Sequence, residues 1–322
     1  MNKTQLDESY YPELLKDVTD FLTQLTAMGM ITEDLHLISS IPSVSMIIAG
    51  ICIKLYGSAE LISPNFKAFY HEFSDDDTSQ EIELVTTPPP SRCYGQVLLQ
   101  NSEMTVFENP DRYVVLFPQM QNLYEAHMLK DGTYVRVYCH PQVSETNIEN
   151  LFHAIRLFFL FTAQRNGLFA IHSASVLYQG KAWLFSGHSG MGKSTHTALW
   201  QRHFGGRVQM INDDKPIIRK KGGVFYVYGT PWMGKSNIGA NISAPLGAVF
   251  LLERDRVNYA EKVSAGKVFP KLLEATLISK KQDRMSKILE LYDEIFSAVD
   301  LYSLHCTISD DAVTAAYDAI CK

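Results

Sequence analysis

The sequence has few cysteines and no apolar run long enough to cross a membrane. Its five cysteines are an odd number and none stands in a CxxC pair, which argues against a zinc site or a disulfide framework. The longest apolar runs fall far short of the roughly 20 residues that a membrane-spanning helix needs. The polar, acidic N-terminus does not have the pattern of a secretory signal. We therefore expect a cytoplasmic protein with reduced thiols and no membrane partner.

The chain also lacks an excess of basic residues. Its 29 Lys and Arg stand against 35 Asp and Glu, a net charge of −6, which argues against a nucleic-acid partner. The share of hydrophobic residues, 46%, and of charged residues, 20%, is that of an ordinary globular protein. A chain of 322 residues buries about three quarters of its unfolded surface and needs no disulfide to fold. Its length predicts more than one structural unit.

Residue patterns divide the chain into three predicted parts. Residues 1–40 are an N-terminal helical segment, residues 41–145 a β-rich domain, and residues 146–322 the domain that carries the chemistry. Apolar residues recur at three- and four-residue steps over residues 11–29, which predicts one amphipathic helix. We expect it to pack on its own chain. The pattern also resembles the last helix of the small PqqD-like domains that hold precursor peptides.

Further elements are predicted from local signals. Short apolar stretches that alternate with turns predict the β-rich domain, and Asp131-Gly132 is a hairpin turn signal. Helical periodicity over residues 146–166 predicts a helix that joins the two halves. Three more elements are predicted near the C-terminus: two helices around residues 267–277 and 285–298, and a strand at 301–306. A final helix is predicted to begin at Asp310.

The strongest signal is the segment GHSGMGKS at residues 187–194, which fits the pattern GxxxxGK[ST]. A short apolar run precedes it and a helix-like stretch follows, which is the context that a phosphate-binding loop requires. Glycines let the backbone wrap around phosphate oxygens, and the following helix offers its positive end. Lys193 is expected to reach the outer phosphates, and the Ser194 hydroxyl to bind Mg²⁺. The residues predicted to bind the nucleotide are Gly187, Ser189, Gly190, Met191, Gly192, Lys193, Ser194 and Thr195.

Two carboxylates follow the next apolar strand, about 20 residues after the loop. A strand beside the phosphate-loop strand would deliver an acid to the metal. We expect Asp213 to bind Mg²⁺ together with Ser194, and Asp214 to take the proton from an attacking hydroxyl. Neighbouring residues of a strand face opposite ways, so both roles require the strand to end there, and Pro216 is consistent with that. Alternatively, one of the carboxylates is a surface residue of the turn.

Three further residues are candidates for substrate contact. The segment YGTPWMGK at residues 228–235 ends a predicted strand and suits an active-site loop, in which Trp232 or Lys235 would contact substrate. A packed turn around a buried tryptophan is the alternative. Arg254 follows the predicted strand at residues 248–252 and would neutralise charge in the transition state, unless it belongs to a solvated charge run. His172, which precedes the phosphate-loop strand, has by itself the pattern of a core or turn histidine.

These pieces together resemble the HPr kinase/phosphorylase and phosphoenolpyruvate carboxykinase superfamily, and most closely its uncharacterised bacterial HPr-kinase-like proteins. The matching pieces are the His172 segment, the loop SGHSGMGKST, INDDKP and YGTPWMGK, and they cover roughly half of the chain. The resemblance implies an α/β fold with a mixed sheet and Mg²⁺-dependent phosphoryl transfer. It also implies that His172 lies near the reaction centre. GTPWMGK replaces the glycine-rich signature of the HPr kinases, so neither HPr as substrate nor the reverse reaction carries over.

The sequence therefore predicts an ATP-dependent kinase of the HPr kinase type, with Mg²⁺ as cofactor. The catalytic residues are predicted to be Lys193, Asp213, Asp214 and His172, and the acceptor is predicted to be a serine hydroxyl of a peptide or protein. The resemblance also allows a homo-oligomer. Two alternatives remain open: a regulator that binds ATP without turning it over, and an NTP hydrolase that uses water as the acceptor.

Overall fold

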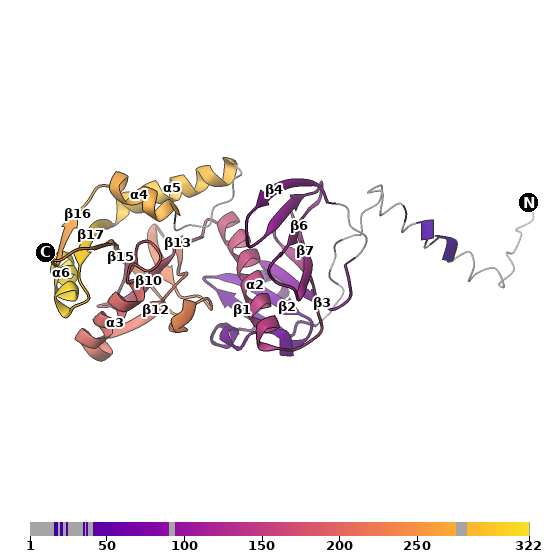
Figure 1. Cartoon of the computed structure of the whole chain (residues 1–322), viewed down its shortest axis with the longest axis horizontal. Coiled ribbons are helices and arrows are strands. Elements are labelled where there is room, and N and C mark those ends of the chain that lie inside the picture. The colour runs from indigo at the N-terminus through magenta and orange to yellow at the C-terminus, as the bar shows by residue number, and fades with distance from the viewer. Residues whose placement is uncertain are drawn as a thin grey trace, which may run out of the picture.

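The chain is a mixed α/β protein with two sheets, each of which belongs to one of two units that lie side by side (Figure 1). The computed structural model describes residues 16–18, 20, 21, 24, 35, 37, 41–89, 94–274 and 282–321. The amphipathic helix predicted for residues 11–29 lies almost wholly outside these described residues. Within them, no helix is both long enough and apolar enough to span a membrane.

The first unit contains an eight-stranded sheet. Its order is β1-β2-β3-β8-β7-β6-β5-β4, with β2, β3 and β8 parallel to one another and all other pairs antiparallel. Gly132 has a φ of 79° in the turn between β7 and β8, so Asp131-Gly132 forms the predicted hairpin. The strands are β1 (Val44–Ile48), β2 (Ile51–Tyr56), β3 (Gln80–Val85), β4 (Gln96–Gln100), β5 (Thr105–Glu108), β6 (Arg112–Leu116), β7 (Leu123–Leu129) and β8 (Tyr134–Cys139). Short 3-10 turns between β2 and β3 are η2 (Ala59–Leu61), η3 (Pro64–Phe69) and η4 (Asp75–Asp77).

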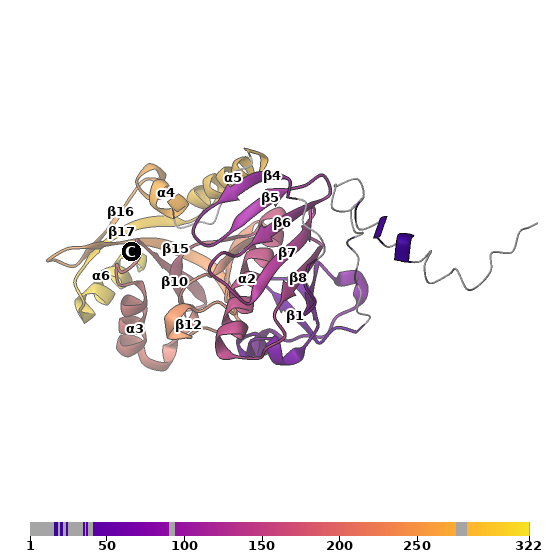
Figure 2. The same cartoon turned by 45° about the vertical axis from the view of Figure 1, so that its right-hand side comes forward.

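Helix α2 (Glu145–Arg165) lies between the two units (Figure 2). Ser144 caps its first turn by accepting a hydrogen bond from the backbone N–H of Asn147. Its buried apolar side chains join the core of the eight-stranded sheet. The domain boundary predicted at residue 145 stays a prediction, because the core that α2 joins also contains Ile217 and Met233 of the second unit. Trp232 of the second unit belongs to the same core, and its Nε1 donates to the carbonyl of Phe152 at 3.0 Å.

The second unit contains a nine-stranded mixed sheet. The main path runs β12-β10-β11-β15-β14-β13-β9, and β17 pairs with both β15 and β16. Strands β11, β15 and β17 are parallel neighbours, as expected for an α/β core, and the remaining pairs are antiparallel. The strands are β9 (Phe169–Ala170), β10 (Ser173–Tyr178), β11 (Lys181–Ser186), β12 (Val208–Asn212), β13 (Ile217–Lys221), β14 (Val224–Tyr228), β15 (Ser243–Arg254), β16 (Tyr259–Lys262) and β17 (Asp300–Cys306).

Helices cover both faces of this second sheet, which gives three layers. Helices α3 (Lys193–Phe204) and α6 (Asp310–Ile320) pack on one face, and α4 (Ala265–Glu274) and α5 (Gln282–Ala298) on the other. The short turns η5 (Gly205–Arg207) and η6 (Gly234–Ser236) follow α3 and β14. The prediction of two helices, a strand and a final helix near the C-terminus is confirmed by α4, α5, β17 and α6.

The strand order corrects one expectation about the site. The strand that ends in the two aspartates, β12, was expected beside β11, but β10 lies between them and is antiparallel to both. Strands β11 and β12 therefore run in the same direction. Ser186 at the end of β11 pairs with Ser173 of β10, and Asn212 at the end of β12 pairs with Ser175. The two carboxyl ends consequently meet at one edge of the sheet, one strand further apart than predicted.

Candidate active site

The glycine-rich loop joins β11 to α3, as the sequence predicted. Gly190 and Gly192 have φ values of 76° and 101°, a region that side chains with a Cβ rarely adopt, and Gly192 caps the helix. Ser194 and Thr195 are exposed in the first turn of α3. Backbone N–H groups at this helix start have no partner within the helix and favour an anionic ligand. Two glycines with positive φ therefore stand directly before the start of α3.

Lys193 lies folded into this loop. Its side chain is 7% exposed, and Nζ donates hydrogen bonds to the carbonyls of Gly187 at 3.1 Å and His188 at 3.2 Å. Burial lowers the pKa of the Lys193 ammonium, and the negative charges of Asp214 and Asp213 oppose that shift. A cation held among loop carbonyls, near two carboxylates, is placed to meet an anionic ligand in the loop.

Asn212, the last residue of β12, holds the turn that carries the two aspartates. Its Oδ1 accepts hydrogen bonds from the backbone N–H groups of Asp214 at 2.9 Å and Lys215 at 2.7 Å. Its Nδ2 donates to the carbonyls of Thr230 at 3.0 Å and Trp232 at 3.3 Å. The Asn212 side chain is fully buried. This one amide therefore ends the strand and fastens the aspartate turn to the loop after β14.

Replacing Asn212 with alanine is expected to lower the free energy of unfolding by about 2–4 kcal/mol, because several buried polar groups lose their partner together. Urea unfolding followed by tryptophan fluorescence measures the change. The matched control is Asn241→Ala, since Asn241 lies at the surface and makes one side-chain bond, to the carbonyl of Ala68. We expect that control to change stability by less than about 1 kcal/mol. Equal effects of the two variants would contradict the role given to Asn212.

Asp214 lies beside His172 at the edge where the strands end. The Nδ1 of His172 is 2.8 Å from Oδ1 of Asp214 and 3.0 Å from Nζ of Lys215. Burial by itself would raise the pKa of Asp214, but the hydrogen bond from His172 and the charges of Lys215 and Arg156 outweigh it, so this pKa lies below its usual value. Burial lowers the pKa of the Lys215 ammonium. Asp214 is therefore ionised at neutral pH and able to accept a proton.

Asp213 faces a different environment from its neighbour. Its side chain is 7% exposed, and Oδ1 is buried without a hydrogen-bond partner among the described residues. A buried carboxylate oxygen without a partner is costly, and a cation relieves that cost. Mg²⁺ binds proteins through one or two oxygen ligands together with substrate phosphates. Asp213 and the Ser194 hydroxyl fit that donor set, although the described residues hold no cluster of three or more His, Cys, Asp or Glu arranged for a metal.

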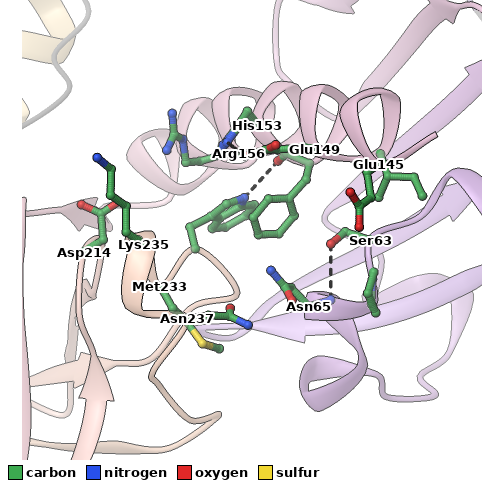
Figure 3. A pocket seen from close by; sticks show the side chains of 15 residues that line it. Ser63, Asn65, Glu145, Glu149, His153, Arg156, Asp214, Met233, Lys235 and Asn237 are labelled. Carbon is green, nitrogen blue, oxygen red and sulfur yellow. Dashed lines mark hydrogen bonds and ion pairs between the residues drawn. The ribbon is translucent and has the colours of Figure 1, made fainter.

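Two cavities lie next to these residues and share no lining residue. The first has a volume of about 690 Å³ and lies between the units, where η3, α2, Asp214 and the loop at residues 232–237 surround it (Figure 3). The second, about 410 Å³, is lined by the glycine-rich loop, the start of α3 and the ends of β15 and β17. Both fall in the size range of small-ligand sites.

The fold places two of the three candidates for substrate contact at the larger cavity and the third at the smaller one. Lys235 is exposed and lines the larger cavity. Trp232 forms part of its wall but is 2% exposed and packs among the aromatic rings of Phe66, Phe152 and Phe159, as the alternative of a buried tryptophan predicted. Arg254 lies at the other cavity, where its Nη2 donates to the carbonyl of Gly190. Arg254 and Lys235 therefore line different cavities.

Sequence reasoning missed three residues of this site. Asn212 and Lys215 belong to the segment INDDKP, in which only the two aspartates were predicted to be functional. An amide that ends a strand can bond to the backbone two residues on, which is the signal that was available for Asn212. Arg156 lies on α2 and lines the larger cavity. Only the packing of α2 against the second unit reveals its position.

Comparison with known proteins assigns this chain neither a family nor an activity. No family model matches the chain, and no curated protein matches it. Among solved structures, that of the HPr(Ser) kinase/phosphatase from Coxiella burnetii aligns with 47% of this chain and 95% of its own, at 8% sequence identity and a TM-score of 0.27. That likeness is too weak to assign an activity, so an assignment has to come from the residues of this chain.

Proposed function

We propose that this protein is a Mg²⁺- and ATP-dependent phosphotransferase that moves the γ-phosphoryl group to a hydroxyl. One observation carries the proposal: the glycine-rich loop with Lys193 and the Asp213-Asp214 turn meet at one edge of a mixed sheet. Asp214 is ionised there and lines a cavity large enough for an acceptor. A protein that only bound ATP would not require a half-buried base beside an acceptor cavity.

The cavity at the outer side of the glycine-rich loop suits the nucleoside. It reaches from Thr195 on α3 to Thr307 and Ile308 after β17, and Arg254 bonds the loop carbonyl of Gly190 beside it. A nucleotide whose phosphates lie in the loop would then point its γ-phosphate toward the Asp213-Asp214 turn. The nucleoside and the acceptor would then occupy two different cavities.

Each residue has a defined task in the transfer. Asp214 accepts the proton of the attacking hydroxyl as the new O–P bond forms and the bond to the β,γ-bridging oxygen breaks, which releases ADP. Lys193 and the loop N–H groups stabilise charge on the phosphoryl oxygens. The Ser194 hydroxyl and the Asp213 carboxylate would hold Mg²⁺, which when bound neutralises charge on the β- and γ-phosphates. His172 orients Asp214 and keeps it ionised.

The direct test is transfer of label from γ-labelled Mg-ATP into size-separated small molecules, peptides and proteins of the source cell. The proposal expects label in a discrete acceptor and ADP as the other product. Label released only as free phosphate would make the protein a hydrolase. ATP binding without turnover would make it a regulator. Either of these last outcomes would overturn the proposal.

The pH profile tests the link between His172 and Asp214. Because the hydrogen bond from His172 helps to lower the pKa of Asp214, removing it in His172→Ala should raise that pKa. The acidic limb of the profile of kcat/KM, where the base becomes protonated, should then move to higher pH. His203→Ala, at an exposed position of α3, is the control and should leave the limb in place. An unchanged limb in His172→Ala would show that His172 does not set the ionisation of Asp214.

A further inference from the structure

The larger cavity has a cationic end beside Asp214 and an acidic end away from it. Arg156 on α2 and Lys235 in the loop after β14 line the cavity with Asp214, and Figure 3 shows Asp214 and Lys235 together at one end. Glu145 lies toward the other end in the same view. The charge of Arg156 helps to lower the pKa of Asp214, so the two groups are electrostatically close.

Arg156 is a cation that is not fully engaged by the protein. Its Nε is buried and has no hydrogen-bond partner among the described residues. One turn earlier on the same helix face, His153 also has a buried ring nitrogen, Nδ1, without a partner in the described part of the chain. Burial and the charge of Arg156 lower the pKa of His153, so its ring is neutral at pH 7. Arg156 and His153 thus line the cavity from one face of α2, and each has a polar atom that the described residues do not pair. The positive charge of Arg156 and Lys235 at this end favours an anionic ligand.

The remaining walls limit what that ligand can be. Phe152 and Trp232 are buried and give the cavity an apolar side. A volume of about 690 Å³ suits a small molecule or a few residues of a peptide, not a folded surface. Glu145 at the acidic end, and Glu149, whose Oε1 lies 3.6 Å from Nε2 of His153, disfavour a second negative charge away from Arg156 and Lys235. The cavity thus matches a compact molecule with one anionic group at the end that faces Asp214.

We propose that the phosphoryl acceptor is a small hydroxyl compound with one anionic group, and that Arg156 and Lys235 bind this group so that the hydroxyl faces Asp214. The proposal rests on the phosphotransferase function proposed above and narrows its acceptor. It also gives the first unit a role, because η3 and α2 supply most of the cavity. Two sources could supply a hydroxyl together with a carboxylate as the anionic group. One is a free hydroxy acid, and the other is a peptide in which an acidic residue stands beside a serine. Of the two sources, the size of the cavity favours the free compound.

The first experiment compares acceptors that differ only in charge, with wild-type protein and γ-labelled Mg-ATP. Glycerate is paired with glyceramide, and L-serine with L-serinamide, so that each neutral member has no additional hydroxyl. The tripeptide Gly-Ser-Glu is paired with Gly-Ser-Gln, both with an amidated C-terminus, to test the peptide source. We expect kcat/KM to be about 10- to 100-fold higher for the anionic member of a free pair, the effect of one or two charge-assisted hydrogen bonds. Preference confined to the peptide pair would overturn the free-compound source, and equal use of both members would overturn the anionic site.

Arg156→Gln tests the residue itself. It should raise KM for the anionic acceptor about 10- to 100-fold and remove the preference over the neutral partner, with a smaller change in kcat. Arg165→Gln, on the same helix but outside the cavity, is the matched control and should keep the preference. A thermal melt shows that each variant is folded. If Arg156→Gln slowed transfer to both members of a pair equally, Arg156 would act on the transferred phosphoryl group and the proposal would be wrong.

The acceptor proposal and the function proposal fail in different ways. Label that enters only a cellular protein, with none in any small compound, would refute the small anionic acceptor and leave the phosphotransferase intact. The phosphotransferase itself would be refuted if phosphate were released to water whether or not an acceptor was added. ATP binding without turnover would refute it as well. The two sets of results do not overlap.

Discussion

Asp214→Asn is expected to lower the rate of phosphoryl transfer by about 100- to 10,000-fold, the range for loss of a general base. The amide has nearly the shape of the carboxylate but accepts a proton far more weakly. The backbone N–H of Asp214 bonds to Asn212, and its carbonyl accepts from the N–H of Ser173, so the turn does not depend on the carboxylate. Single-turnover transfer from labelled ATP measures the loss, and calorimetry measures ATP binding, which should persist.

Asp213→Asn is the comparison that separates the two neighbouring acids. If Asp213 holds Mg²⁺, its variant should need more Mg²⁺ for half-maximal activity, and added Mg²⁺ should restore part of the rate. Asp214→Asn should show no such rescue, because its defect lies in proton transfer. Rescue of Asp214→Asn by Mg²⁺, or transfer within threefold of wild type, would contradict the division of roles between the two acids.

Much of the second unit could be predicted because its signals are local. A strand, a glycine-rich loop and a helix follow one another at residues 182–204, and glycines with positive φ stand where the loop turns. The C-terminal helices have apolar periodicity that needs no knowledge of the rest of the fold. The end of β12 at Asn212 was also readable, since Pro216 follows four residues later.

The strand order could not be predicted in the same way. The position of β10 between β11 and β12 depends on which strands pair. Buried strands all consist of similar apolar residues, so their sequences do not indicate which strands are neighbours. The acceptor cavity is still harder to predict from the sequence, because it is formed by η3, α2 and the loop after β14, which are far apart in the chain. Arg156 looks like one more charged residue of an amphipathic helix until the helix is packed against the second unit.

Lys193→Met is expected to remove most phosphoryl transfer and to leave the fold intact. Methionine replaces the aliphatic stem of the lysine but carries no charge toward the phosphates, so the transition state loses its fixed cation. We expect kcat to fall by about 100- to 1,000-fold, the scale for loss of one preorganised electrostatic group. Single-turnover transfer measures this change. Lys181→Met, at an exposed position of β11, is the matched control and should transfer at the wild-type rate.

The stability of Lys193→Met separates function from folding. Burial lowers the pKa of Lys193, so its charged form is disfavoured in the folded state relative to the unfolded chain. The unfolded state then binds more protons than the folded state as pH approaches the ordinary lysine value, and this group makes stability rise with pH there. Methionine removes the buried charge and that slope, but also the hydrogen bonds to the carbonyls of Gly187 and His188. Because these two effects oppose each other, we expect the melting temperature to change by less than about 5 °C. A larger fall would show that the variant lost transfer because it unfolded, and Lys193 would then be a structural residue.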